Sequence, residues 1–201
     1  SSIFRAIQNL NKIENVNLIP LKDLVDFVTS DRKKEIIEES SKCISILHIV
    51  NVDILDFKEL MNYQPKFAGI VCKPDDLIFS KINPRIPRAL VVPDLKMPLT
   101  CSSEFEIINS KCEINNYGMK ALLMLPSVQT QINHLTSGTS SSHNRIKTKE
   151  LKEVLIPIPS KKSSEYLKFI NLLEKSEKEH KSMNKLAVNR VKLMDELSEV
   201  F

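Results

Sequence analysis

Residues 75–92 read DDLIFSKINPRIPRALVV, and this stretch places two apolar runs on either side of a polar, basic connection. The two runs, residues 77–79 and 89–92, have the length and the aliphatic content of buried strands. Pro84 and Pro87 restrict the backbone of the connection and interrupt regular strand pairing. The stretch therefore predicts two strands joined by a stiff turn that presents basic side chains.

The polar side chains on this turn are of the types that bind nucleic acid. Arginine or lysine can pair with guanine edges, asparagine can pair with adenine, and the same cations neutralise phosphates. The residues are Lys81, Asn83, Arg85 and Arg88. An ordinary solvated turn contains the same residue types, so spacing alone leaves both interpretations open.

A second basic segment follows the polar stretch TSGTSSSHNR, residues 136–145. Small hydroxyl groups and backbone amides suit a loop that lies along phosphates, and neighbouring cations add charge. The candidate contacts here are His143, Asn144, Arg145 and Lys147. A catalytic Ser/His interpretation would need an orienting group and an oxyanion hole nearby, and the sequence offers neither.

The overall charge is modest, but its distribution is uneven. The chain has 201 residues, of which 42% are hydrophobic and 27% charged, and its formal net charge is +4. These values are typical of a folded globular protein. Basic residues outnumber acidic ones in residues 66–92 and 134–152, which is where both candidate contact segments lie. A local affinity for an anionic partner is therefore expected.

Cysteine spacing and apolar run lengths point to a cytoplasmic protein without a metal site. The four cysteines form no Cys-x-x-Cys pair and no histidine stands at metal-ligand spacing from them. Most of them lie in or beside apolar runs, as buried reduced thiols do. No apolar run approaches the roughly 20 residues that cross a bilayer, and no signal-peptide pattern opens the chain. The cysteines are Cys43, Cys72, Cys101 and Cys112.

Enzyme motifs are weak or missing. Three isolated glycines cannot build a glycine-rich phosphate loop. Glu150 with Lys152, and Glu179 with Lys181, each give half of a nuclease-type metal site. A chain rich in lysine and glutamate contains this pattern by chance. We therefore expect no catalysis and no cofactor, with a metal-dependent nuclease as a minor alternative.

Hydrophobic periodicity predicts a mixed set of elements before residue 160. Pro126 suits the first turn of a helix, and Gly138 suits the end of one. The expected elements are a short amphipathic helix over the first dozen residues, strands at 21–27, 43–57, 69–72, 77–79, 89–92, 104–108 and 154–159, two helices within 117–138 that meet at Pro126, and a helical turn at 149–153.

Residues 163–201 contain no proline or glycine and predict one long helix that follows a globular domain of residues 1–160. Its apolar residues alternate at three- and four-residue spacings, as in a coiled coil, and Arg190 fills the one missing position. The stripe consists of Met183, Leu186, Leu193, Leu197 and Val200. Such a stripe needs a partner helix, although a helix that folds back on its own domain is the alternative.

Four segments, in this order, resemble the target recognition domain of the specificity (S) subunit of type I restriction–modification systems. They are DDLIFSKINPRIPRALVV, CSSEFEII, PSVQTQINHLTSGTSSSHNRIKTKELKEVLIPIP and the closing helix. The resemblance covers roughly residues 18–201. The acidic–glutamine pair that the family carries after its Pro-x-Pro is absent, because SKKSSEYLKF follows here. A full S subunit has two recognition domains and two helices, so this chain is similar to half of one.

The resemblance implies an α/β (α+β) globular target recognition domain followed by a long coiled-coil helix. The domain would read one half of a bipartite DNA sequence, and the helix would pair antiparallel with a second helix as a spacer. Methylation and cleavage would belong to separate modification and restriction subunits, which would bind S-adenosylmethionine, ATP and magnesium.

The expected partners are double-stranded DNA, the methyltransferase (modification) subunit and, through it, the restriction subunit. A second half subunit, identical or different, would pair with the helix. The remaining alternative is a non-enzymatic protein–protein interaction module that uses the coiled-coil helix.

Overall fold

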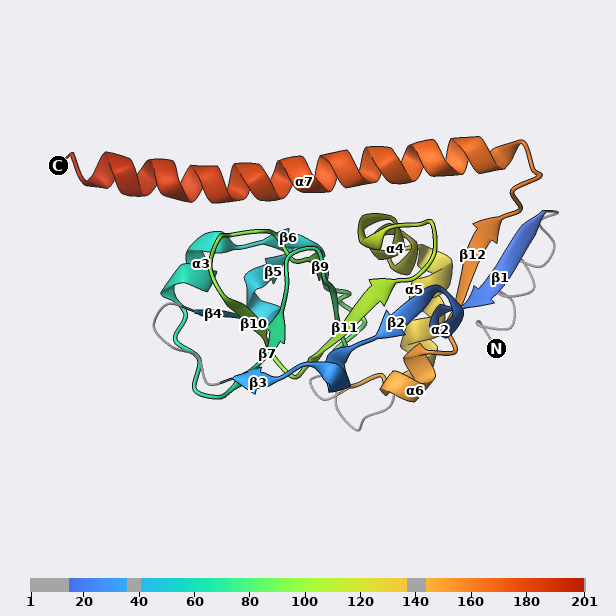
Figure 1. The fold of residues 1–201 in the computed structure, drawn as a ribbon, viewed down its shortest axis with the longest axis horizontal. Coiled ribbons are helices and arrows are strands. Elements are labelled where there is room, and N and C mark those ends of the chain that lie inside the picture. The colour runs from blue at the N-terminus through green and yellow to red at the C-terminus, as the bar shows by residue number, and fades with distance from the viewer. Residues whose placement is uncertain (1–14, 36–40, 137–143, 201) are drawn as a thin grey trace.

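The computed structural model describes residues 15–35, 41–136 and 144–200. In this part of the chain, small sheets and short helices form a domain that lies along one side of a single long helix, α7 (Glu165–Ser198) (Figure 1). The predicted fold, a mixed α/β domain followed by a long helix, is confirmed.

Two four-stranded sheets form the centre of the described domain. One has the order β2 (Val25–Phe27), β11 (Phe105–Ser110), β8 (Leu77–Ser80), β9 (Ala89–Val91), with antiparallel neighbours throughout. The other has the order β3 (Lys34–Glu35), β7 (Gly69–Cys72), β10 (Leu99–Cys101), β4 (Lys42–Ile44), and its β10–β4 pair is parallel. Two antiparallel pairs complete the pairing: β1 (Val16–Pro20) with β12 (Leu155–Pro159), and β5 (Ile49–Val50) with β6 (Ile54–Leu55).

The β8–β9 hairpin separates two hydrophobic clusters. Leu77 and Phe79 belong to one cluster and Ile78 to the other. In β9, Val91 belongs to the first cluster and Leu90 to the second. Because successive side chains of a strand point to opposite faces, a strand buried on both faces needs a continuous apolar run. This explains why the two strands of the opening stretch are apolar at nearly every position.

The helices begin where capping residues or proline permit. Asn115 caps α4 (Asn116–Leu123) by accepting a hydrogen bond from the Gly118 amide. Pro126 stands in the first turn of α5 (Pro126–Leu135), as predicted. The short helices are α2 (Leu21–Leu24), η1 (Thr29–Asp31), η2 (Ile46–His48), α3 (Phe57–Asn62) and α6 (Thr148–Leu151).

Several predicted elements are confirmed, and two predicted strands are wrong. Residues 21–27 begin with a helical turn because Leu21 and Leu24, three positions apart, enter the same cluster. Residues 43–57 form no single strand. Ser45 caps η2, and the positive φ angles of Asn51 (47°) and Val52 (80°) turn the chain between β5 and β6.

Strands β7, β8, β9, β11 and β12, helices α4, α5 and α7, and the helical turn α6 lie close to their expected positions. Strands β1, β3 and β10 and helix α3 were not predicted. The helix expected in the first dozen residues and the helix end expected at Gly138 lie outside the described residues.

One face of α7 packs on the domain, against α4, β6, α3 and β12. Phe169 and Leu173 contact the first hydrophobic cluster, and His180 and Asn184 are buried farther along. The Asn184 side chain accepts a hydrogen bond from the Leu55 amide (3.0 Å). The alternative that the helix folds back on its own domain therefore holds for this face.

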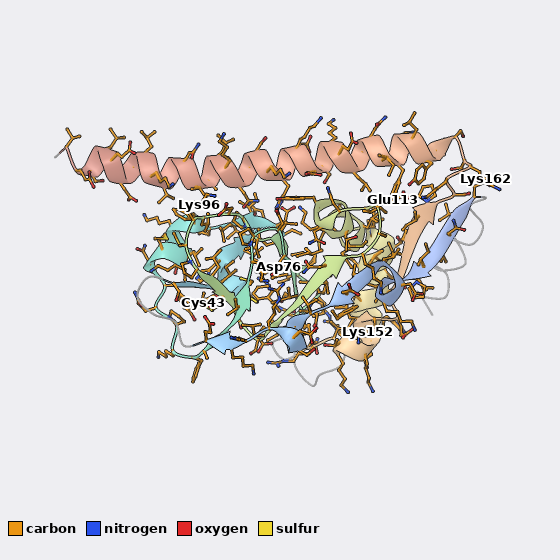
Figure 2. All side chains as sticks on the ribbon, viewed as in Figure 1. Cys43, Asp76, Lys96, Glu113, Lys152 and Lys162 are labelled. Atoms are coloured by element: carbon orange, nitrogen blue, oxygen red, sulfur yellow. The ribbon has the colours of Figure 1, made fainter. Side chains whose placement is uncertain are left out.

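A second face of α7 stays uncovered. The five stripe residues predicted from the sequence are between 45% and 75% exposed. Side chains also project from the side of α7 that is turned away from the domain (Figure 2). Packing on the domain thus leaves the five side chains of the predicted coiled-coil stripe exposed.

Candidate nucleic-acid interface

The turn between β8 and β9 is held by hydrogen bonds at both ends. The Ser80 amide donates to the Arg88 carbonyl (2.9 Å), and the Ser80 hydroxyl donates to the Ile82 carbonyl (3.0 Å). Asn83 adopts the left-handed conformation (φ 46°), which asparagine tolerates better than most residues. The Ile86 amide closes the tip by donating to the Asn83 carbonyl (3.0 Å). The turn is therefore preorganised.

The structure brings the two predicted contact segments together. Ile82 and Arg145 form an isolated antiparallel bridge. The Asn83 amide donates to the Asn144 carbonyl (2.7 Å), and the Ile146 amide donates to the Lys81 carbonyl (3.0 Å). The turn of residues 81–88 and the segment of residues 144–147 thus form one surface, which we call the paired-turn surface.

A buried carboxylate supports the paired-turn surface from beneath. Glu106 in β11 accepts hydrogen bonds from the hydroxyls of Thr29 and Thr148. It also forms an ion pair with Lys81, whose ammonium lies 3.1 Å from its Oε2. A buried charge needs such partners. Lys81 therefore ties the turn to the core, and the Glu106 carboxylate neutralises much of its charge.

Two other candidates are also engaged by the protein itself. Arg145 forms an ion pair with Glu104 (2.7 Å) while its side chain stays 54% exposed. Asn144 is buried and engaged in an interaction with the protein. A guanidinium with exposed edges can still meet an anion, whereas a buried amide is poorly placed to read a base.

The remaining described candidates lie at the surface. Arg85 and Lys147 are exposed, while Arg88 and Asn83 are half-buried. The Arg88 guanidinium donates a long hydrogen bond to the Ile86 carbonyl (3.5 Å). Within the described residues, none of these three cations forms an ion pair. His143, the eighth candidate, lies outside the described residues.

The residues that position these cations were not identified from the sequence. Glu104 and Glu106 bind Arg145 and Lys81, and Thr29 and Thr148 hold Glu106. One signal was available, because Glu106 stands inside the apolar run of β11. A carboxylate within a buried strand implies a buried partner.

The paired-turn surface and α7 lie on different sides of the domain. Helix α6 begins directly after Lys147, and it lies at the edge of the domain farthest from α7 (Figure 1). A large anionic partner could therefore contact this surface without meeting the long helix.

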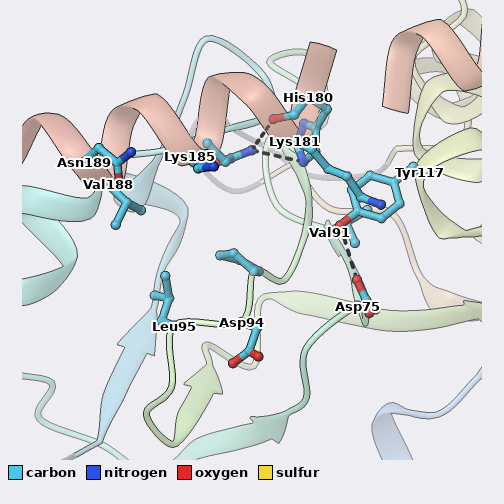
Figure 3. Close-up of a pocket in the computed structure, with 12 residues that line it drawn as sticks. Asp75, Val91, Asp94, Leu95, Tyr117, His180, Lys181, Lys185, Val188 and Asn189 are labelled. Carbon is cyan, nitrogen blue, oxygen red and sulfur yellow. Dashed lines mark hydrogen bonds between the residues drawn. The ribbon is translucent and has the colours of Figure 1, made fainter. Parts of the chain in front are cut away.

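A second polar cluster lies beneath α7. A pocket of about 330 Å³ lies between part of the helix and the domain, with Asp75, Tyr117, His180 and Lys181 in its lining (Figure 3). The Tyr117 hydroxyl donates to Asp75 (3.2 Å), and the Lys181 ammonium lies 4.5 Å from the Tyr117 ring centroid. Burial and the Asp75 carboxylate raise the pKa of Tyr117 to about 12, so the phenol stays neutral.

The described residues give little indication of a metal site or of a reactive nucleophile. No group of three or more His, Cys, Asp or Glu side chains among them could hold a metal ion. Cys43, Cys72 and Cys101 are buried free thiols, and hydrogen bonding with Cys72 together with burial raises the pKa of Cys101. No helix in the described part of the chain is both long enough and apolar enough to span a bilayer.

The fold is similar to that of solved specificity subunits. The type I restriction–modification S subunit from M. genitalium superposes with a TM-score of 0.52 at 17% identity, over 92% of this chain and 45% of that one. The HsdS subunit from Thermoanaerobacter tengcongensis gives a TM-score of 0.46 at 9% identity, over 92% and 45% of the two chains.

A chain from a structure on complex assembly and conformational transition of the type I R-M system gives a TM-score of 0.48 at 10% identity, over 99% and 51%. The chain thus spans about half the length of the solved structures that it matches. No protein-family model and no curated protein matches the sequence. The predicted resemblance to half an S subunit is confirmed at the level of the fold.

Proposed function

We propose that this chain, which has the fold of half an S subunit, is a sequence-specific DNA recognition subunit of a type I restriction–modification system. The observation that carries the proposal is the paired-turn surface. Two basic segments, about 60 residues apart in the sequence, are joined there by backbone hydrogen bonds. The likeness in fold to the S subunit from M. genitalium supports the proposal.

In this proposal the candidate residues have different roles. Arg85 and Arg88, on the stiff turn, are the side chains best placed to reach base edges or phosphates. Lys147 would contact a phosphate. Lys81 and Arg145 would chiefly hold the surface in shape, because Glu106 and Glu104 already neutralise much of their charge.

Catalysis would lie with other subunits. The chain would direct a methyltransferase (modification) subunit and, through it, a restriction subunit to the DNA half-site. These partners would add the affinity that a net charge of +4 does not provide. Since the target is cellular DNA, the chain would act in the cytoplasm.

The direct test is selection of duplexes from a random DNA library by the purified full chain. We expect enrichment of one short motif with binding that weakens as salt rises. The matched control replaces Arg85, Arg88 and Lys147 together by alanine, which should abolish the enrichment. Recovery of no motif at low salt, with the fold intact by circular dichroism, would contradict the proposal.

A second candidate function rests on the uncovered stripe of α7. A protein–protein interaction module would use this stripe and would leave the basic turns without a role. This function predicts that the helix binds a partner protein. It also predicts that the chain binds DNA no more tightly than the variant in which Arg85, Arg88 and Lys147 are replaced by alanine. The same selection experiment therefore separates the two functions.

A further inference from the structure

The turn between β10 and β11 borders the paired-turn surface. The Phe105 amide closes this turn by donating to the Ser102 carbonyl (3.1 Å). The Lys81 amide donates to the Glu104 carbonyl (2.8 Å), and the Arg145 Nη2 donates to Glu104 Oε1 (2.7 Å). Each of the two basic segments thus supplies one bond to Glu104, one to its backbone and one to its carboxylate. Glu104 is therefore fixed at the place where the two segments meet.

The Glu104 carboxylate differs from the other carboxylates at this surface. Glu106 is buried and bound to Lys81 and two hydroxyls, and Glu150 accepts from the Lys147 amide at the start of α6. The Glu104 side chain is 26% exposed. Among the described residues, Arg145 engages its Oε1 and no hydrogen bond or ion pair engages its Oε2. Oε2 is thus an acceptor held in place at the surface.

DNA offers few groups to such an acceptor. Phosphates repel a carboxylate, and the hydrogen-bond donors of the major groove are the N4 amino group of cytosine and the N6 amino group of adenine. Adenine N6 lies between two acceptors, its own N7 and O4 of the paired thymine, and N7 would repel the carboxylate. Cytosine N4 has an acceptor on one side only, where O6 and N7 of the paired guanine attract a cation. The ion pair of Glu104 with Arg145 therefore complements a C·G base pair best.

We infer that Glu104 is a specificity-determining residue that accepts a hydrogen bond from the N4 amino group of one cytosine in the DNA half-site. Arg145 is its positioning residue, since it holds the carboxylate in place. The inference deepens the proposed function and rests on it. Because the two opposite charges largely cancel, the pair adds discrimination between sequences more than affinity for all of them.

The first experiment is selection of duplexes from a random library by the full chain and by two variants. The wild type should require cytosine at one position of its motif. Glu104→Ala removes the acceptor and a negative charge, so it should accept any base at that position and bind unselected DNA at least as tightly. Glu104→Gln should accept adenine there, because glutamine pairs with adenine N6 and N7. A purely structural role would instead weaken every position of the motif together.

The second experiment changes the DNA and leaves the protein intact. N4-methylcytosine still pairs with guanine, but a methyl group replaces the N4 hydrogen that faces the major groove. At the cytosine of the motif, this base should weaken binding of the wild type about tenfold and leave binding of Glu104→Ala nearly unchanged. The same base placed outside the motif is the DNA control and should change neither affinity.

The matched protein control is Glu113→Gln. It removes a carboxylate from an exposed ion pair with Lys161 (2.9 Å), beside the start of α7 and away from the paired-turn surface (Figure 2). The motif and the affinity of this variant should equal those of the wild type. Circular dichroism of each variant separates loss of base reading from loss of folding, and the modified duplex tests the wild type without any substitution.

The outcomes separate this inference from the proposed function. Loss of the cytosine requirement in Glu104→Ala, together with sensitivity of the wild type to N4-methylation, supports the inference. A wild-type motif without a required cytosine, or one whose cytosine is kept by Glu104→Ala and tolerates N4-methylation, would overturn it and leave DNA recognition in place. A wild-type chain that selects no motif would overturn both.

Discussion

Arg85 and Lys147 differ from Lys81 and Arg145 in what surrounds their charge. The first two are exposed and form no ion pair with described residues, whereas the second two are bound to Glu106 and Glu104. At the residue scale this difference separates side chains available to a ligand from those that shape the surface. Substitutions at the two kinds of residue should therefore have different consequences.

Replacing Arg85 by alanine should weaken binding to the selected DNA by about 1–3 kcal/mol and relax one base position, as expected for a base contact. Lys147→Ala should instead weaken all sequences alike and lower the salt slope by about 1. Titration of labelled duplexes over a salt series measures both quantities. Lys162→Ala, an exposed lysine just before α7, is the control and should change neither. An unchanged affinity and motif for Arg85→Ala would remove that residue from the interface.

Replacing Glu106 by alanine should destabilise the fold by on the order of 3 kcal/mol, because it leaves the Lys81 ammonium and two hydroxyls without their buried partner. Glu104→Ala, which breaks the more exposed pair with Arg145, should cost less than about 1 kcal/mol. Urea denaturation of both variants gives the comparison. Equal losses of stability would show that Glu106 is not the anchor of the turn.

At the element scale, the docked face of α7 depends on a small number of polar contacts. Lys120 of α4 contacts both Asp53 and His180, and Asn184 accepts from the Leu55 amide. A buried donor or acceptor that loses its partner lowers the stability of the fold, so these hydrogen bonds fix where the helix lies on the domain.

Asn184→Ala should loosen this docking, because it leaves the Leu55 amide buried without an acceptor at a cost of about 1–3 kcal/mol. Hydrogen exchange at β6 should become faster while exchange in β8 stays slow. Asn189→Ala, an exposed position on the same helix, is the matched control. Unchanged protection of Leu55 in the Asn184 variant would mean that this bond does not hold the helix.

Acid should weaken the same junction. Burial opposes ionisation of Asp53, but hydrogen bonds from His180 and Lys120 outweigh it and hold the Asp53 pKa below its usual value. A lowered carboxyl pKa adds stability that is present above the unfolded pKa of 3.8 and is lost as pH falls through the folded pKa. Stability measured from about pH 5 downward should therefore fall less steeply for Asp53→Asn than for the wild type. Identical slopes would exclude this contribution.

For the whole molecule, one helix has a face that is docked on the domain and a separate apolar stripe that is exposed. Its docked face completes the domain, because α7 covers β6 and contributes Phe169 and Leu173 to the first hydrophobic cluster. Removal of the helix would expose that cluster and the Leu55 amide. Point substitutions on the uncovered stripe are therefore a cleaner test of assembly than truncation after Pro159.

Leu193→Lys should convert a dimer into monomers, because it places a charge in the middle of the apolar stripe. Leu167→Lys is the matched control, since Leu167 is also exposed on α7 but lies off the stripe. Light scattering of the full chain at matched concentrations gives the masses. Monomers from both variants, or dimers from both, would argue against the stripe as the interface.

Local pattern in the sequence determined much of the fold. The apolar runs of β7, β8, β9 and β11, the helix α4 with its Asn115 cap, the helix α5 with Pro126 in its first turn, and the uninterrupted helix α7 follow from residues within a few positions of one another. The short elements α2, α3 and β10 contain too few residues for such a pattern. Which conformation they adopt depends on how their side chains are buried in the folded domain. Both candidate contact segments were also found from the sequence, because basic residues cluster locally in each.

Only the tertiary structure decided which of those basic residues are engaged and what the long helix contacts. Arg145 meets Glu104 across 41 positions of sequence, and Lys120 meets His180 across 60. Spacing carries no information about such pairs, because they form only when the packed strands bring distant residues together. The sequence alone thus predicted a basic turn and an apolar stripe. The folded chain joined the two turns and paired Lys81 and Arg145 with carboxylates. It also docked α7 through Phe169, Leu173 and a few buried polar groups, because a buried charge or amide is stable only beside its partner.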